Sequence, residues 1–345
     1  MSPPPTQHAQ LQELAYNALN HYFRAHPDLT PEIEVLPPAF EPTDALILED
    51  GANLGVPKKI LALAFVHARR LFFAHHKLDG FTAQTTTHDA TRVMLLFDPE
   101  HLTAANSRKR YLLDLQREDT VVEALHAERR FLDSILTSPL HRQSKSPTLW
   151  AHRAWWSDML ISRLSCSDWG IFFTTELDAA IKSGERHPKN YYAWQYARRV
   201  VEKSGEWLSG EEFEDFISEC AAKVSRWCMR HVGDISGFSF LMYVLGRVSA
   251  PDERARVVEE IVTYGLNVQL ANESLWTFVR MALASGLIEE AMKNNMLREL
   301  GKCGEEQNGE SRLFSARLSE TLYWIAENEV VNDSPRMEDG IWDFK

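Results

Sequence analysis

Histidine and cysteine side chains at helical spacing are one group of residues in this sequence that could do chemistry, because they could bind a metal ion. His67, His75 and His76 fall within one apolar segment, but the last two would face different sides of a helix, and no acidic ligand lies nearby. Cys228 and His231 are three residues apart and would need further ligands from elsewhere. We therefore predict no metal site on this chain.

Basic pairs are the second candidate, because a phosphate-bearing ligand needs local positive charge. Arg129-Arg130, and Arg69-Arg70 with Lys58-Lys59, form such patches, although pairs of this kind more often lie on solvated helix faces. The sequence has no GxGxxG, GxxxxGK[ST] or GxSxG motif. Dinucleotide-binding, P-loop and serine-hydrolase motifs are therefore not found.

Composition sets further limits on function. The 345 residues carry a formal net charge of −12, which disfavours binding to nucleic acid or to an anionic membrane. The four cysteines lack the spacing of a metal site and suggest reduced thiols. The longest apolar stretch, residues 60–66, is too short to span a bilayer, and no basic, apolar leader opens the sequence. We expect a cytoplasmic protein without a membrane span.

Helical periodicity dominates the elements that must position any site. Apolar residues at i, i+3 and i+4 predict a first helix over residues 11–22, and a second long helix runs from Pro57 to about His76. Five prolines between 27 and 43 predict an extended connector without regular structure, and beyond about His76 no alternating strand pattern with hairpin turns is visible. Helices then alternate with short breaks up to about residue 328. We divide the chain into an N-terminal helix with its connector, a helical repeat domain and a flexible tail (residues 1–45, 46–330 and 331–345).

Internal repetition is the most informative feature. A residue suited to capping a helix is followed four positions later by a marker position, which is usually a large aromatic. Successive markers are 45, 44, 44 and 38 residues apart, and an apolar-periodic segment lies between each pair. Each repeat is therefore predicted to be a two-helix hairpin whose apolar face is buried by its neighbours. The markers are Ala105, Trp150, Trp194, Phe238 and Trp276.

The aromatic markers and the arginines that follow them are expected to be structural. Trp150, Trp194 and Trp276 at helical spacing should lie in the core, since tryptophan buries a large apolar area. Arg153 and Arg198 follow three or four residues later, on nearly the same helix face. We expect them to tie neighbouring helices together through carbonyls or carboxylates.

These repeats resemble those of protein prenyltransferase α subunits, in which an Asn is followed by a Trp four positions later and by Arg at positions seven and eight. Residues 188–194, Pro-Lys-Asn-Tyr-Tyr-Ala-Trp, and 272–276, Asn-Glu-Ser-Leu-Trp, match best, and the resemblance covers roughly residues 55–285. Because Ala105 and Phe238 replace two of the tryptophans, the chain is most similar to a divergent branch of the family. The resemblance implies an all-α, right-handed superhelical crescent of stacked helical hairpins.

The resemblance also implies a partner and a reaction. Family members support the transfer of a geranylgeranyl or farnesyl group from its diphosphate to a C-terminal cysteine of an acceptor protein. They act in a heterodimer with a β subunit. For this chain the resemblance implies a β subunit of the Rab geranylgeranyltransferase type. The β subunit holds the catalytic Zn²⁺, and Mg²⁺ can assist departure of the diphosphate. The resemblance implies no cofactor on this chain, which alone would be inactive.

Four residues inherit candidate roles from the family pattern. Lys145, just before one cap, would contact the diphosphate, and Lys189, just before Asn190, is a second candidate for that contact. Tyr191 and Tyr192 would line the surface facing the β subunit and, with Lys145, are the candidate catalytic residues; Tyr192 stands where the family has His. The alternative readings are a solvated surface lysine and tyrosines that serve packing or an interface.

Two functions stay open from the sequence. The chain could be the α-type subunit of a prenyltransferase, or a catalytically silent repeat scaffold that binds a protein partner on its concave face. The repeat pattern is only partly kept: Asn272 is present, whereas Val279 stands at an expected Arg position. This partial loss is compatible with both functions.

Overall fold

The computed structural model describes residues 7–40, 44–115, 118–306 and 312–328, which form two compact units. Unit 1 comprises residues up to 168 together with 178–196, and unit 2 comprises 169–177 and the residues from 197 onward. Helices α8 and α9 contribute residues to both units. We describe each unit by itself.

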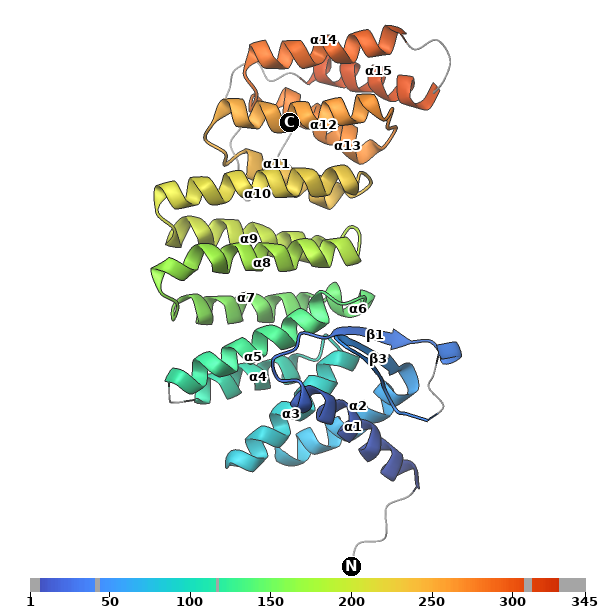
Figure 1. The fold of residues 1–345 in the computed structure, drawn as a ribbon, viewed down its shortest axis with the longest axis vertical. Helices are drawn as coiled ribbons and strands as arrows, with labels where there is room; N and C mark the ends of the chain where they lie inside the picture. The colour runs from blue at the N-terminus through green and yellow to red at the C-terminus, as the bar shows by residue number, and fades with distance from the viewer. Residues whose placement is uncertain (1–6, 41–43, 116–117, 307–311, 329–345) are drawn as a thin grey trace, which may run out of the picture. The chain divides into compact units, whose positions relative to one another are not determined.

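Unit 1 begins with three packed helices. Helix α1 (Gln7–Ala25) packs on α2 (Lys58–His75), which in turn packs on α3 (Phe81–Phe97) (Figure 1). Both helices predicted in this region, over residues 11–22 and from 57 to about 76, are confirmed. Pro57 precedes the first residue of α2, where its fixed φ and missing N–H suit a helix start.

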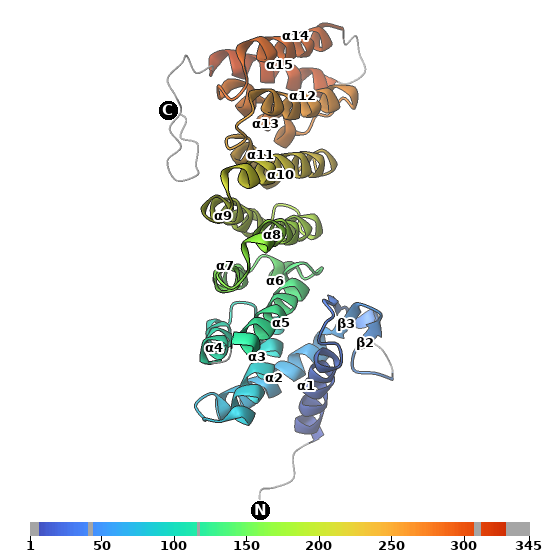
Figure 2. The same cartoon turned by 60° about the vertical axis from the view of Figure 1, so that its left-hand side comes forward.

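A small three-stranded sheet occupies the region between α1 and α2. Its strands β1 (Glu32–Leu36), β2 (Leu48–Asp50) and β3 (Asn53–Pro57) are arranged in the order β1-β3-β2, and Figure 2 labels β2 and β3. Strand β1 pairs with β3 in parallel, and β2 pairs with β3 as an antiparallel hairpin. The prediction of an irregular connector without strands was therefore wrong. The strands are only three to five residues long, and the β1–β3 pairing joins residues about twenty positions apart, so local patterning does not reveal them.

The remainder of unit 1 consists of helical hairpins. Helix α4 packs on α7 and α5, α5 packs on α7, and the short α6 follows α5. The first helix of each hairpin contains a repeat marker. The elements are α4 (Leu102–Asp114), α5 (Glu118–Leu136), α6 (His141–Ser144), α7 (Pro147–Ile161), α8 (Cys166–Arg186) and the start of α9 (Tyr191–Trp207).

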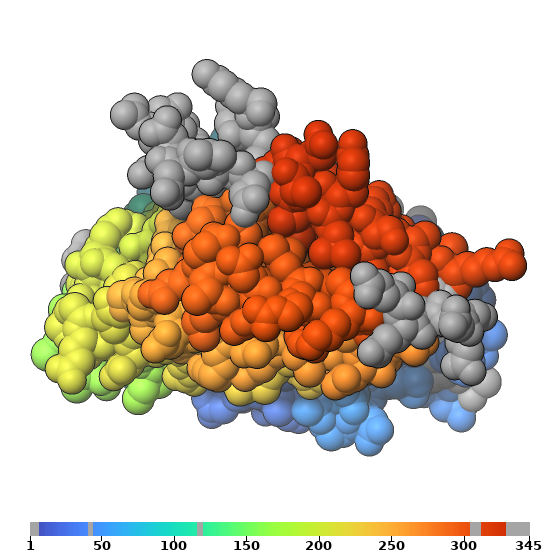
Figure 3. Space-filling model, turned by 90° about the horizontal axis from the view of Figure 1, so that it is seen from above, coloured from blue at the N-terminus to red at the C-terminus, as the bar shows by residue number. Residues whose placement is uncertain are grey.

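Unit 2 continues the same pattern. Helix α11 packs on α10 and α13, and α12 packs on α10, α13 and α14. At the C-terminal end of this unit, α14 and α15 lie side by side, coloured orange and red (Figure 3). The helices are α10 (Gly210–Arg230), α11 (Ile235–Leu245), α12 (Pro251–Asn267), α13 (Glu273–Ala284), α14 (Glu290–Glu306) and α15 (Arg312–Glu327).

The predicted all-α stack of helical hairpins is confirmed, with fifteen helices and one small sheet in the described residues. The crescent, its handedness and the domain boundaries stay predictions, and the predicted tail, 331–345, lies outside the described residues. Among the helices described, each is too short or too polar to cross a bilayer.

A buried ion network stabilises the first hairpin of unit 1. Arg108 Nε donates to Glu128 Oε1 over 2.8 Å, and His152 Nε2 lies 2.7 Å from the same oxygen. All three side chains are almost completely buried, and the Arg108 guanidinium lies 4.1 Å above the Phe131 ring. Burial alone would raise the pKa of Glu128, but Arg108 and His152 hold that pKa well below its ordinary value. Glu128 is therefore a buried carboxylate that joins α4, α5 and α7.

Replacement of Glu128 should be costly, because removal of one partner leaves buried positive charge unpaired. We expect Glu128→Ala to lower the free energy of unfolding by about 3–5 kcal/mol. Glu260→Ala is the control, since Glu260 forms a half-exposed i,i+4 pair with Arg256 and should cost about 0.5 kcal/mol or less. Chemical denaturation of the two variants measures the difference, and equal losses would contradict a special role for the network.

Candidate functional site

The repeat markers occupy equivalent buried positions. Trp150 and Trp276 each donate the indole N–H to the carbonyl six residues earlier, Ser144 at 2.7 Å and Leu270 at 2.6 Å. Each indole thus fixes the loop that precedes its own helix. Ala105, Trp194 and Phe238 are also at most 2% exposed. The prediction that the markers lie in the core is confirmed.

Two glycines make room for the indole rings. A Cβ on Gly184 of α8 would lie 3.1 Å from Trp194 Cζ2, and a Cβ on Gly265 of α12 would lie 3.2 Å from Trp276 Cζ2. In both hairpins the indole therefore packs against a position on the preceding helix where a larger residue would be crowded. Trp194 and Trp276 therefore pack in equivalent places, each against a glycine. Trp150 and Trp276 form equivalent hydrogen bonds, each to the carbonyl six residues earlier.

The caps of successive repeats are tied to each other within each unit. Ser146 Oγ accepts from Leu149 N and donates to the Pro99 carbonyl at 3.2 Å, which precedes the earlier repeat helix. Asn190 Nδ2 donates to the Ser144 carbonyl at 3.0 Å, one repeat back. In unit 2, Ser274 Oγ donates to the Gly233 carbonyl at 3.3 Å. Hydrogen bonds therefore connect the N-terminal ends of neighbouring repeat helices.

The two repeat asparagines differ in their bonding. Asn190 is fully buried, donates also to Ser183 Oγ at 3.1 Å and accepts from Ala193 N at 3.3 Å. Asn272 occupies the same repeat position but makes no side-chain cap hydrogen bond. The repeat pattern alone could not separate a working cap from one that has lost its bond.

This difference predicts unequal effects of the same substitution. Asn190→Ala should lower the free energy of unfolding by about 2 kcal/mol, because buried donors and acceptors lose their partner. Asn272→Ala is the matched control and should change stability by about 0.5 kcal/mol or less. Thermal and chemical unfolding of the full chain measure both, and similar losses would show that the capping bonds are not what Asn190 contributes.

The repeat arginines join helices as predicted. Arg153 is completely buried, its Nη1 donates to Asp133 Oδ1 on α5 at 2.6 Å, and its guanidinium packs near the Tyr196 ring. Arg198 Nη2 donates to Ser239 Oγ on α11 at 2.9 Å. Arg153 uses a carboxylate, whereas Arg198 uses a hydroxyl, which was not among the expected acceptors.

The candidate lysines and tyrosines gather at one turn of unit 1. Lys145 Nζ donates to the Pro188 carbonyl at 3.1 Å, which places its ammonium against the turn that contains Lys189. Lys189 is exposed and adopts a left-handed conformation with φ 58°. Tyr191 and Tyr192 begin α9 directly after this turn and are 60% and 38% exposed. The structure therefore brings together four residues that the sequence places in two separate repeats.

Sequence reasoning missed a row of apolar residues at the same edge. Leu102 is 62% exposed and occupies the first position of α4, as Pro147 does in α7 and Tyr191 in α9. These exposed residues follow directly after the caps of three successive repeats, and the caps are joined by the hydrogen bonds described above. In unit 2, Ile235 occupies the same position of α11 and is 43% exposed. Aligning the repeats one position after the cap would have revealed the pattern.

His187, which the sequence did not single out, lies beneath this turn. Its Nε2 is 3.1 Å from the Ser138 carbonyl, and its ring meets that of His141 edge-on with centroids 5.6 Å apart. Burial lowers the pKa of His187, and the positive charges of Lys145 and Arg186 lower it further. Arg186 forms an ion pair with Glu32, so Lys145 is the cation of this pair that is left to attract an anion to the turn.

A lowered histidine pKa predicts that stability falls in acid. The unfolded chain takes up the proton at a higher pH than the folded one, so the free energy of unfolding should decrease between about pH 7.5 and pH 5.5. His187→Gln, which keeps a donor for the Ser138 carbonyl, should decrease less over this range. Urea unfolding at several pH values compares the two, and parallel profiles would exclude His187 as a contributor.

The histidines and cysteines considered for metal binding are engaged otherwise. His75 and His76 direct Nδ1 to carbonyls of their own helix, and His231 stacks on Trp227 with centroids 4.2 Å apart. Burial raises the pKa of the Cys228 thiol well above its usual range, and Asp234 adds to this. Among the side chains that the structure describes, no group of three or more His, Cys, Asp or Glu is placed to hold a metal ion.

Comparisons with known proteins agree with the repeats. A family model described as the ECM9 middle domain matches residues 160–265. Protein prenyltransferase alpha subunit repeat-containing protein 1-B of Xenopus laevis is 24% identical over 303 residues, which cover 81% of this chain and 65% of that protein. Protein prenyltransferase alpha subunit repeat-containing protein 1 of Homo sapiens is 25% identical over 197 residues, which cover 53% and 45%. The matched region thus spans less than two thirds of either relative, and the resemblance stated from the repeats is confirmed.

Proposed function

We propose that this relative of the prenyltransferase α-subunit repeat proteins is the α-type, non-zinc subunit of a heterodimeric protein prenyltransferase. The convergence of Lys145 with the turn 188–192 supports this most directly, because it joins the two segments to which the family pattern assigns the diphosphate and the partner surface. The names of the relatives and the hydrogen-bond geometry that Trp150 and Trp276 have in common add to it.

In this proposal, the partner is a β subunit of the Rab geranylgeranyltransferase type, and the group transferred is geranylgeranyl or farnesyl. The thiolate sulfur of a C-terminal cysteine bonds to C1 of the prenyl diphosphate while the C1–O bond breaks. The electron pair leaves with the diphosphate, and the thiol proton passes to solvent. Zinc belongs to the β subunit and lowers the pKa of the acceptor thiol.

The residues of this chain would act on the leaving group and on the interface. One of the three N–H bonds of the Lys145 ammonium is directed to the Pro188 carbonyl, which leaves two for phosphate oxygens. Positive charge near the departing diphosphate stabilises the negative charge that develops on it. Tyr191, Tyr192 and Leu102 would supply exposed apolar area to the β subunit, since such residues are enriched in the cores of protein interfaces.

Lys145→Ala tests the catalytic part of this proposal. In the complex with a Rab-type β subunit, kcat/KM for prenyl transfer should fall at least about 10-fold, because a charged donor to the leaving group is lost. The complex should still form, since the tyrosines and Leu102 are unchanged. Lys203→Ala is the control, because Lys203 pairs with Glu206 on α9 within unit 2.

Mass spectrometry of an acceptor peptide detects the thioether, and co-purification reports assembly. Transfer that is equal for Lys145→Ala and the unchanged chain would contradict the role of Lys145. A stable complex that forms no thioether with any prenyl diphosphate would favour the second candidate, a catalytically silent scaffold. The missing cap bond at Asn272 is the observation that favours this alternative, because it shows erosion of the repeat.

A further inference from the structure

Helix α2 carries a concentration of positive charge that is unusual for so acidic a chain. Residues 51–78 contain no Asp or Glu, although the chain as a whole has a net charge of −12. Five basic side chains lie in this stretch, and within the described part of the chain none of them forms an ion pair with a carboxylate. They are Lys58, Lys59, Arg69, Arg70 and Lys77.

Several arginines elsewhere in unit 1 form ion pairs with carboxylates. Arg24 pairs with Asp89, Arg108 with Glu128 and Arg153 with Asp133. The arginines of α2 instead contact uncharged groups: Arg70 bonds to Gln12 of α1, and the Arg69 guanidinium lies 5.3 Å from the centroid of the Phe73 ring. Their unused N–H donors are therefore available to an external anion.

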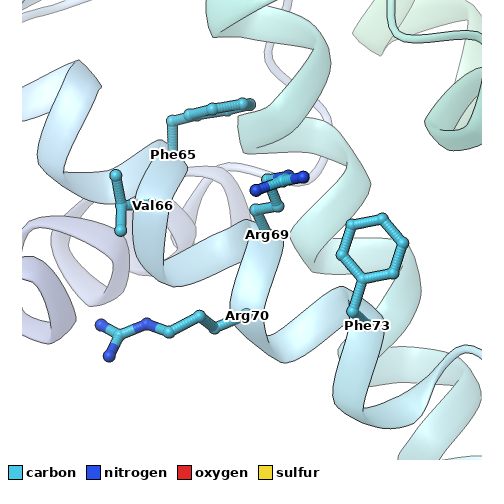
Figure 4. A pocket seen from close by; sticks show the side chains of 5 residues that line it. All are labelled: Phe65, Val66, Arg69, Arg70 and Phe73. Carbon is cyan, nitrogen blue, oxygen red and sulfur yellow. The ribbon is translucent and has the colours of Figure 1, made fainter.

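Apolar side chains on the same helix shape a shallow groove around these arginines. Phe65, Val66, Arg69, Arg70 and Phe73 line a cavity of about 330 Å³, and all five project from α2 (Figure 4). Val66 is 42% and Phe73 49% exposed, and Arg69 lies between the two phenylalanines along the helix. Exposed apolar side chains beside unpaired guanidinium groups offer a ligand both apolar and charged contacts.

We propose that this groove binds an acidic segment of a partner protein, in which a carboxylate residue lies next to an apolar one. A guanidinium held against an aromatic ring presents its N–H fork to a carboxylate in bidentate geometry, which is stronger and more specific than a single contact. The apolar side chain of the segment would pack against Phe73, whose ring is 49% exposed. The groove shares no residue with the turn 188–192, and the proposal does not rest on prenyl transfer.

The groove has a defined boundary at the end of α2. A second cavity, of about 180 Å³, follows there, and its lining includes Lys77 and Arg110 but also Asp79 and Asp114. Charges of both signs make that cavity nearly neutral. The unpaired positive charge beside apolar groups is therefore concentrated around Arg69, where we expect the segment to bind.

Fluorescence anisotropy with the full chain tests the proposal. The probe is a short labelled peptide in which Glu alternates with Leu and Phe, and its comparators are a Glu-only peptide and a peptide with Lys in place of Glu. We expect the alternating peptide to bind most tightly and the Lys peptide not to bind. Arg69→Ala should weaken binding about 10-fold, and Arg69→Lys should restore only part of it, since an ammonium lacks the planar fork.

Two further variants guard the interpretation. Phe73→Ala should weaken binding of the alternating peptide more than that of the Glu-only peptide, because it removes an apolar contact as well as the ring beside Arg69, and Arg256→Ala in unit 2 should change neither. Arg69 is exposed and its variants should fold, which circular dichroism checks. Affinity that is equal for Arg69→Ala and the unchanged chain would overturn the proposal. So would binding to phosphatidylserine vesicles with no binding to the alternating peptide, which would identify an anionic membrane as the occupant.

Discussion

Burial of the five repeat markers, three of which are tryptophans, is the constraint on which the repeat architecture depends. A two-helix hairpin cannot bury its own apolar face, so every hairpin must be held at a fixed distance from its neighbour. In the repeats of Trp150 and Trp276 the indole fills that space and also binds the loop before its own helix. The glycines that receive the rings of Trp194 and Trp276 allow the helices to approach closely. Packing and loop position are thus fixed by one side chain.

Fixed loops explain why the candidate site residues gather where the repeat helices begin. The Ser144 carbonyl accepts hydrogen bonds from both the Trp150 indole and the Asn190 amide, so the loop of one repeat is bound to the cap of the next. In the repeat of Trp194, the carbonyl six residues earlier belongs to Pro188. This carbonyl accepts a hydrogen bond from Lys145 of the preceding repeat. The lysine is therefore part of the network that positions the turn. Any role in binding an anion would use an ammonium that the scaffold already holds in place.

The sequence predicted the repeats and the two helices that precede them, but it did not predict structure that depends on contacts between distant, unrepeated segments. Five markers at nearly equal steps were sufficient for the hairpins, the buried tryptophans and the helix-joining arginines, because each copy supports the others. The sheet formed by β1, β2 and β3 has no second copy and depends on pairing between distant short strands. The contact of Lys145 with Pro188 likewise joins residues 43 positions apart through the shape of two loops. The family pattern identified the candidate residues, but only the structure shows that they lie close together.

Charge placement separates the parts of unit 1 that maintain the fold from the part that faces outward. Arg108 and Arg153 are buried and paired with carboxylates, since an unpaired charge in the interior would be costly. The arginines of α2 are exposed, so solvent removes that constraint, and pairing them would have required only one nearby acidic residue. An acidic chain has many such residues, yet none falls within 51–78. Structural stability does not account for that segregation, whereas a surface that must attract an acidic partner does, because any internal carboxylate would compete for the same guanidinium groups.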